Sequence, residues 1–217
     1  MTDFPARRTM MVDTQVRPSD VTKFPIIEAM LSVRREEFVP AAQREAAYMG
    51  ENLALGGGRV MLEPRTFAKM LDAIDIAPND LVLDIGSGLG YSSAVIAHMA
   101  EAVVALEEDE DMAREAPEVL MTAGADNVIT HCGPLATGAK EHGPYDVIMI
   151  QGGVGRVPKD IIDQIKDGGR IICLFMDGAL GEVRVGYKTG DRISWRRAFN
   201  AGAPVLRGFE KRDAFLL

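Results

Sequence analysis

The sequence predicts an α/β protein with a doubly wound, mostly parallel seven-stranded sheet, a helical N-terminal cap and an antiparallel C-terminal hairpin. From about residue 80, short apolar runs alternate with segments of helical periodicity, as is typical of a parallel sheet buried on both faces. The length of 217 residues suits one large domain. We therefore expect a single domain over residues 1–217, with the cap over 1–63 and the α/β core with its closing hairpin over 64–217.

The residues before the core predict helices separated by breaks. Ser19 and Asp20 are candidate N-caps for a helix whose apolar positions recur at helical spacing: Ile26, Ile27, Met30 and Leu31. After a proline break, a short helix is expected over 41–48. A flexible glycine loop is expected at 56–58, and Pro64 suits the first turn of a further helix.

The core is expected to alternate strands with helices. The strands are expected at 81–85, 102–106, 128–131, 145–150 and 170–174. Helices are expected at 91–99 and 112–123, with a third that carries Ile161, Ile162 and Ile165. Two alternating segments, at 182–187 and 192–199, flank a turn and predict a hairpin antiparallel to the rest of the sheet.

Composition narrows the class of protein. The net charge of −8 disfavours binding of nucleic acid, whose phosphates repel an acidic protein on average. No run of about 18 apolar residues occurs, so no membrane span is expected. The polar N-terminus leads into no apolar signal core, which predicts a cytoplasmic protein. Cys132 and Cys173 are expected in a buried strand or at a strand end, as reduced core thiols.

Basic residues gather in the N-terminal stretch. They are either solvated charges or a face for an anionic substrate: Arg7, Arg8, Arg17, Lys23, Arg34 and Arg35.

The clearest chemical signal is the segment Asp84-Ile85-Gly86-Ser87-Gly88-Leu89-Gly90-Tyr91, between an expected strand and an expected helix. Its glycines let the backbone turn sharply and approach a ligand closely, at the carboxyl end of a strand where open α/β sheets bind ligands. Tyr91 stands where a dinucleotide fingerprint needs its third glycine, and no lysine follows as a phosphate-binding loop requires. The loop therefore serves a ligand that need not carry phosphate.

Two acids accompany this loop. Glu107 ends the second expected strand, where a carboxylate can accept hydrogen bonds from both hydroxyls of a ribose. Asp84 ends the first strand and is placed to meet a positively charged amino group, directly or through water. A nucleoside that bears an amino acid fits both acids. The alternative is a glycine turn with Glu107 merely solvated.

The segment 82–91 resembles motif I of class I S-adenosylmethionine-dependent methyltransferases. N-terminal segments, among them Arg-Glu-Glu-Phe-Val-Pro at 35–40, make the chain similar to the protein-L-isoaspartate O-methyltransferase family over about residues 10–175. The resemblance implies a Rossmann-like methyltransferase sheet, S-adenosylmethionine as cofactor and S-adenosylhomocysteine as its product. It also implies a cofactor site lined by Asp84, Gly86, Ser87, Gly88 and Gly90, with Glu107 on the ribose. Our own hypothesis for the adenine is contact with backbone amides near Leu135.

The sequence departs from the family pattern in places. Leu62 stands where the family has a serine beside the substrate carboxylate, and Pro134 where it has an aspartate that contacts the adenine amino group. One hypothesis makes Arg59 a clamp on an anionic acceptor in place of that serine, and the alternative is a solvent-facing arginine. Met61 and Leu62 could instead form an apolar acceptor pocket.

The expected activity is methyl transfer to a carboxylate of isoaspartyl protein, or to a related peptide or small-molecule acceptor. A carboxylate is ionised at neutral pH and needs no general base, so no catalytic residue is assigned. The alternative is a cofactor-binding homologue with lost or redirected catalysis, which acts on another substrate or through a protein partner. An RNA acceptor is disfavoured by the acidic balance. His98, His131 and His142 lack metal-ligand spacing, so no metal is expected, and the oligomeric state stays open.

Overall fold

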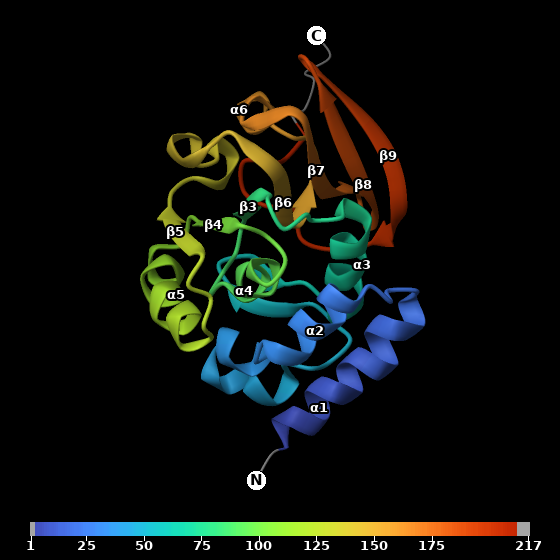
Figure 1. The fold of residues 1–217 in the computed structure, drawn as a ribbon, viewed down its shortest axis with the longest axis vertical. Helices are drawn as coiled ribbons and strands as arrows, with labels where there is room; N and C mark the ends of the chain where they lie inside the picture. Colours follow the sequence, from blue (N-terminus) through green and yellow to red (C-terminus); the bar gives the residue numbers. More distant parts are fainter. Residues whose placement is uncertain (1–2, 212–217) are drawn as a thin grey trace.

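The computed structural model describes residues 3–211 and has a seven-stranded sheet at its centre (Figure 1). The sheet order is β5-β4-β3-β6-β7-β8-β9, in which β5, β4, β3, β6 and β7 are parallel, and β8 and β9 pair antiparallel. The predicted fold class is therefore confirmed, closing hairpin included. The strands are β3 (Leu81–Ile85), β4 (Ala102–Glu107), β5 (Val128–Cys132), β6 (Tyr145–Val154), β7 (Ile165–Asp177), β8 (Leu180–Thr189) and β9 (Arg192–Ala201).

Helices cover the sheet and form the N-terminal cap. Figure 1 shows α1 and α2 together at the N-terminal end of the molecule, and α2 packs against both α3 and α4. The helices are α1 (Phe4–Met11), α2 (Phe24–Ser32), α3 (Pro64–Ile74), α4 (Tyr91–Ala97), α5 (Glu110–Thr122) and α6 (Lys159–Asp163). Shorter helical turns lie at 12–16, 17–19, 35–38, 41–46, 135–137 and 140–142.

Three details of the predicted helices are wrong. The N-cap of α2 is Lys23, because a proline in the first turn of α2 fixes the helix start, and Asp20 instead ends the preceding turn with φ at 66°. The helix expected over 41–48 is a 3-10 segment over 41–46. Ile165 begins β7 rather than continuing α6, and its apolar side chain is buried in the sheet core.

The glycine loop expected at 56–58 is the turn of a small antiparallel hairpin, β1 (Leu53–Gly56) and β2 (Arg59–Met61). All three glycines have positive φ, from 56° to 101°, which other residues rarely adopt. The strands have only 4 and 3 residues, so their alternation is too short to predict from sequence. The hairpin lies over the loop that follows β3: a β-carbon on Gly88 would lie 2.7 Å from Leu55 Cδ1.

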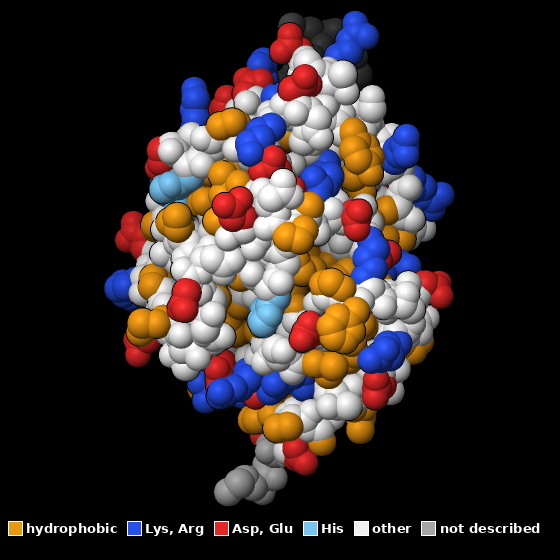
Figure 2. All heavy atoms as spheres, in the orientation of Figure 1, with side chains coloured by type: hydrophobic (Ala, Val, Ile, Leu, Met, Phe, Trp, Pro, Cys, Tyr) orange, Lys and Arg blue, Asp and Glu red, His pale blue; other side chains and the backbone are white. Residues whose placement is uncertain are grey.

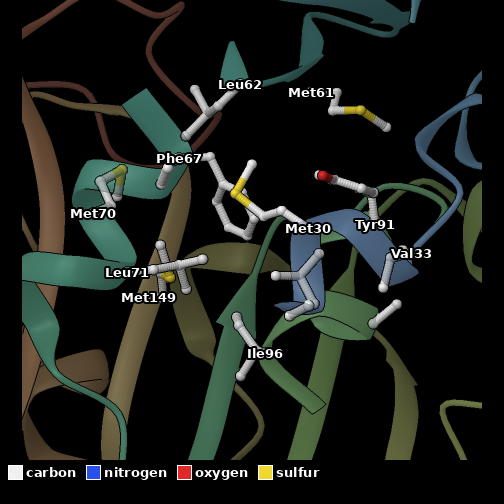
Figure 3. Packing of buried hydrophobic residues seen from close by; sticks show 14 of the residues in the cluster. Met30, Val33, Met61, Leu62, Phe67, Met70, Leu71, Tyr91, Ile96 and Met149 are labelled. Atoms are coloured by element: carbon white, nitrogen blue, oxygen red, sulfur yellow. The ribbon is translucent and has the colours of Figure 1, made fainter. Parts of the chain in front are cut away.

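Apolar side chains fill both faces of the main sheet. Figure 3 shows part of one layer, in which Met30 of α2, Phe67 of α3 and Met149 of β6 come together. The opposite face is lined by Leu83 and Ile85 of β3 and their neighbours. Cys173 is buried as predicted.

The prediction for Cys132 is wrong. Cys132 is exposed, because β5 is an edge strand with only partial cover. Over residues 3–211, no helix is long and apolar enough to cross a bilayer.

Candidate functional site

The carboxyl ends of β3 and β4 lie side by side, and the glycine loop passes between them. The backbone N–H groups of Gly86 and Ser87 both donate to the carbonyl of Leu106, at 2.8 and 3.2 Å, which holds the loop against β4. Gly86 and Gly88 have φ of 82° and 58°, and Gly90, at 98°, is the N-cap of α4. The strand, loop and helix around this signal are as the sequence predicts.

Glu107 is the last residue of β4, and its side chain turns inward beneath the loop. It is 1% exposed. Its Oε2 accepts the backbone N–H of Gly88 at 2.7 Å, and its Oε1 accepts those of Glu108 and Asp109 at 2.9 and 3.1 Å. Three backbone donors thus fix a buried carboxylate at the strand end, where the sequence expects the ribose acceptor.

Arg59 of β2 reaches the same carboxylate. Its Nη2 lies 2.9 Å from Glu107 Oε2 and its Nε lies 3.2 Å from Oε1, which makes a bidentate ion pair. The two side chains are 4% and 2% exposed. The guanidinium also lies against the glycine loop, because a β-carbon on Gly86 would lie 2.5 Å from Nη2. The solvent-facing alternative for Arg59 is therefore wrong, and the structure places the guanidinium on Glu107 rather than free for an acceptor.

Asp84 is the residue before the last in β3 and is completely buried. Its Oδ2 accepts the hydroxyls of Ser92 and Ser93 at 2.5 and 2.6 Å, and its Oδ1 accepts the side-chain amide of Gln151 at 2.7 Å. Burial raises the pKa of Asp84, while these three hydrogen bonds and the nearby Arg59 charge oppose the rise. The amino-group partner expected for Asp84 is thus replaced by neutral protein donors.

These three donors are not among the residues that the sequence predicts for the site. Ser92 and Ser93 stand in the first turn of α4, directly after the glycine loop, and Gln151 lies on β6, the strand next to β3. The signal that could have found them is position, because polar residues near the carboxyl end of adjacent parallel strands meet at one edge of the sheet.

A cavity of about 20 Å³ remains between the hairpin and the glycine loop. Of the residues predicted for cofactor or acceptor, four line it: Gly86, Ser87, Met61 and Leu62. Leu135 does not line this cavity, and its side chain packs in the core beneath the sheet. Ligand pockets commonly measure roughly 300 Å³ or more, so the space now open holds about one water molecule.

The side of the cavity that is predicted to face the acceptor is apolar. Met61 and Leu62 are 7% and 3% exposed, and Figure 3 shows both among the packed side chains above α2 and α4. Behind them the guanidinium of buried Arg35 donates to the carbonyls of Ala47 and Leu62, at 2.7 Å each. Arg35 also lies over the Tyr91 ring, 4.7 Å from its centroid.

The basic N-terminal residues form no free cationic face. Arg35 is buried, and the other five each pair with a carboxylate: Arg7 with Glu45, Arg8 with Glu36, Arg17 with Asp13, Lys23 with Asp72 and Asp75, and Arg34 with Glu37. Figure 2 shows charged side chains of both signs interspersed over the face seen in Figure 1. The expectation of an anion-binding face is therefore not supported by this part of the chain.

The fold brings together two histidines that lie apart in sequence. His131 Nδ1 lies 3.4 Å from Glu141 Oε1, and the rings of His131 and His142 meet edge to face at 5.5 Å. The ligand atoms of these three residues lie within 4.8 Å of one another, so small side-chain movements would let them hold a divalent ion. Spacing along the chain gave no sign of the cluster, because the segment after β5 folds back on that strand.

Comparison with known proteins places this geometry in a family. The family model described as protein-L-isoaspartate(D-aspartate) O-methyltransferase matches residues 7–189. The chain belongs to this family. It is 36% identical over 172 residues to a protein-L-isoaspartate O-methyltransferase of Syntrophus aciditrophicus, covering 79% of each chain. It is 34% identical over 184 residues to protein-L-isoaspartate O-methyltransferase 2 of Nitrosococcus oceani, covering 84% of each.

Solved structures of the family have the same fold. One protein-L-isoaspartate O-methyltransferase superimposes with a TM-score of 0.80 at 25% identity, over 93% of this chain and 66% of that one. A putative family member from Plasmodium falciparum, solved in complex with S-adenosyl-L-homocysteine, superimposes with a TM-score of 0.78 at 18% identity, over 95% of this chain and 99% of that one.

The fit of this site to an adenosyl cofactor can be judged from its own atoms. The acceptor at the end of β4 and the close approach that Gly86 permits both suit a nucleoside. The space does not, because the cavity between the hairpin and the glycine loop measures only about 20 Å³ and the Arg59 guanidinium lies against Gly86. The polar groups thus fit the cofactor, whereas the volume now open does not.

Proposed function

We propose that this chain is an S-adenosylmethionine-dependent methyltransferase whose acceptor is a carboxylate, with the isoaspartyl group of damaged protein as the first candidate. Membership of the protein-L-isoaspartate O-methyltransferase family supports the proposal. The single observation that carries it is the 2.7 Å hydrogen bond from the glycine loop, at Gly88, to the carboxylate of Glu107, where two parallel strands end together. That arrangement presents an acid and a close backbone to a ribose.

The residues then have separate roles. Glu107 would accept the ribose hydroxyls, Gly86 and Gly88 would let the backbone lie against the ligand, and Asp84 would keep the loop in place through α4. Backbone amides near Leu135 would face the adenine. The cofactor supplies a methyl group on a positively charged sulfur. The carboxylate acceptor is already ionised, so the chain has only to align it and remove its water.

The cap over residues 1–63 would form the acceptor side of a single methyltransferase domain over 1–217, of which 3–211 are described. Met61 and Leu62 would pack against the acceptor, and the buried Arg35 would hold that segment through the Leu62 carbonyl. The partner in this account is a protein or peptide with an exposed, flexible isoaspartyl residue.

The test is transfer of labelled methyl groups. Purified protein is incubated with S-adenosylmethionine labelled in the methyl group and with a peptide that contains one isoaspartyl residue. The matched control peptide has an ordinary aspartyl residue in the same place. We expect a base-labile ester, released as labelled methanol, with the isoaspartyl peptide alone. Absence of label from both peptides, with protein that binds the cofactor, would contradict the isoaspartyl assignment.

A second candidate function is cofactor binding with lost or redirected catalysis. Leu62 favours it, because this buried side chain offers no hydrogen bond and its backbone carbonyl is already taken by Arg35. The same labelling experiment separates the two candidates. Cofactor binding without an isoaspartyl ester, followed by label in a different acceptor class, would support redirected catalysis.

A further inference from the structure

We propose that Arg59 is an internal competitor of the cofactor: its guanidinium occupies the nucleoside pocket and holds Glu107, so the pocket opens only when Arg59 withdraws. The inference rests on the proposed function, because it concerns access to the same pocket. Arg59 is then neither a catalytic residue nor a substrate clamp, but the residue that sets how tightly the cofactor binds.

The Arg59 guanidinium takes up space that the cofactor would need. The Arg59 guanidinium lies where a β-carbon on Gly86 would be, at 2.5 Å from Nη2 and 3.1 Å from Nη1. That is the surface of the glycine loop on which a nucleoside has to lie. The cavity between the hairpin and the glycine loop measures about 20 Å³, far below the volume of a nucleoside pocket. A cofactor and the guanidinium cannot occupy this surface together.

The hydrogen bonds to Glu107 occupy all of its acceptor sites. Its two oxygens accept two from Arg59 and three from the backbone of Gly88, Glu108 and Asp109. A carboxylate has about four lone-pair sites, so none is free for a ligand. A ribose diol brings two hydroxyl donors, which is the number that Arg59 gives up on leaving. The three backbone donors remain, so Glu107 stays stabilised as an anion throughout the exchange.

One buried hydrogen-bond donor of Arg59 has no acceptor in the closed arrangement, in which Arg59 pairs with Glu107. Arg59 Nη1 is buried and makes no hydrogen bond with the described residues. The side chain as a whole is 4% exposed, so water does not readily reach this nitrogen. A buried donor without an acceptor lowers the stability of the closed state relative to one with all groups paired. This unpaired donor is a cost of the closed arrangement that withdrawal of Arg59 would remove.

The hairpin that carries Arg59 packs on the glycine loop and on β6 without joining the main sheet. It is a separate two-stranded sheet joined by three consecutive glycines with positive φ, and it makes no strand pairing with the main sheet. On its far side, a groove of about 300 Å³ is lined by three carboxylates: Asp109, Asp111 and Glu115. A guanidinium that leaves Glu107 therefore meets other acids close by.

The experiment measures binding of S-adenosylhomocysteine by titration calorimetry, which needs no turnover. Wild-type protein is compared with Arg59→Met, which removes the guanidinium but keeps an unbranched chain. The matched control is Arg65→Met, an exposed arginine on α3. A binding-competent state that is 0.1–10% populated weakens apparent affinity by roughly 10- to 1,000-fold. We therefore expect Arg59→Met to bind about tenfold or more tightly than wild type, and Arg65→Met to bind as wild type does.

The outcomes separate this inference from the proposed function. Tighter binding by folded Arg59→Met supports the competition, above all if wild type shows weak or no heat. Equal or weaker binding by Arg59→Met overturns it, because a residue that merely supports the pocket would lower affinity when removed. Failure of all three proteins to bind overturns the proposed function itself, and the competition with it.

Arg59→Lys keeps the test decisive if the methionine variant does not fold. A lysine cannot pair with both carboxylate oxygens as the guanidinium fork does, so its hold on Glu107 is weaker. The expected order of affinity for S-adenosylhomocysteine is Arg59→Met above Arg59→Lys above wild type. A lysine variant that binds no more tightly than wild type would contradict the proposal.

Discussion

Asp84 and Glu107 stand at the ends of neighbouring parallel strands, are both buried, and are stabilised in different ways. Asp84 is held by two serine hydroxyls of α4 and an amide of β6, all neutral and all part of the core. Glu107 is held by backbone amides and by Arg59, which comes from a separate hairpin. The difference indicates that Asp84 is a permanent part of the scaffold, whereas one partner of Glu107 is exchangeable.

Removing the charge of Glu107 is expected to cause the largest loss of stability. Glu107→Gln leaves the Arg59 guanidinium buried without its counter-ion. Breaking a buried ion pair in this way costs about 3–5 kcal/mol. Urea denaturation at pH 7 measures the loss, with Glu108→Gln, on the next and partly exposed residue, as the control. A cost below about 1 kcal/mol would mean that the Arg59 contact contributes little in solution.

Asp84→Asn is expected to be milder. The two serine hydroxyls can rotate and the Gln151 amide can turn over, so most hydrogen bonds can be remade around an asparagine. We expect a loss of about 1–2 kcal/mol, set by the donors that stay imperfectly paired. Urea denaturation again gives the value. A loss as large as that for Glu107→Gln would erase the distinction between the two acids.

The pH dependence of Asp84 sharpens the same comparison. Burial raises its pKa in the folded protein, so the folded state binds a proton more tightly than the unfolded chain does. The resulting stability is fully present below the unfolded pKa of about 3.9 and is lost as pH rises through the folded pKa. The stability of wild type minus that of Asp84→Asn should therefore fall as pH rises above about 4. A difference that increases with pH would show that the three donors, and not burial, dominate.

The smallest loss of stability is expected for an exposed ion pair. Lys23 Nζ lies 2.7 Å from Asp75 Oδ1, and the two side chains are 44% and 78% exposed. Asp75→Asn keeps the left-handed backbone at φ 56°, which asparagine tolerates, and removes only the charge. We expect a loss of about 0.2–1 kcal/mol that shrinks with added salt. A larger loss would mean that the short distance between the charged atoms of an ion pair contributes more to stability in this protein than the burial of the pair does.

The fold could be predicted from sequence where patterns are long and local. The apolar runs of β3, β4 and β6 are nearly continuous, and the glycines after β3 have positive φ, so the sheet and its ligand loop follow from the residues themselves. The hairpin β1–β2 could not be predicted, because 4 and 3 residues are too few for a period to appear.

The candidate site was predicted less completely than the fold. The position of Glu107 follows from the end of β4, whereas its burial does not. The partner of Glu107 does not, because Arg59 is 48 residues away along the chain and comes to it only through the hairpin. In the same way, His131 and His142 meet because the segment between β5 and β6 folds back. Residues that are distant in sequence and meet through short irregular elements leave no periodic signal.

The most direct measurement is a crystal structure of the full chain grown with S-adenosylhomocysteine. The account predicts the ribose hydroxyls on the carboxylate of Glu107, the three backbone amides still in place, and the guanidinium of Arg59 withdrawn from Gly86. Density for the ligand elsewhere, with Arg59 and Glu107 still paired, would contradict it.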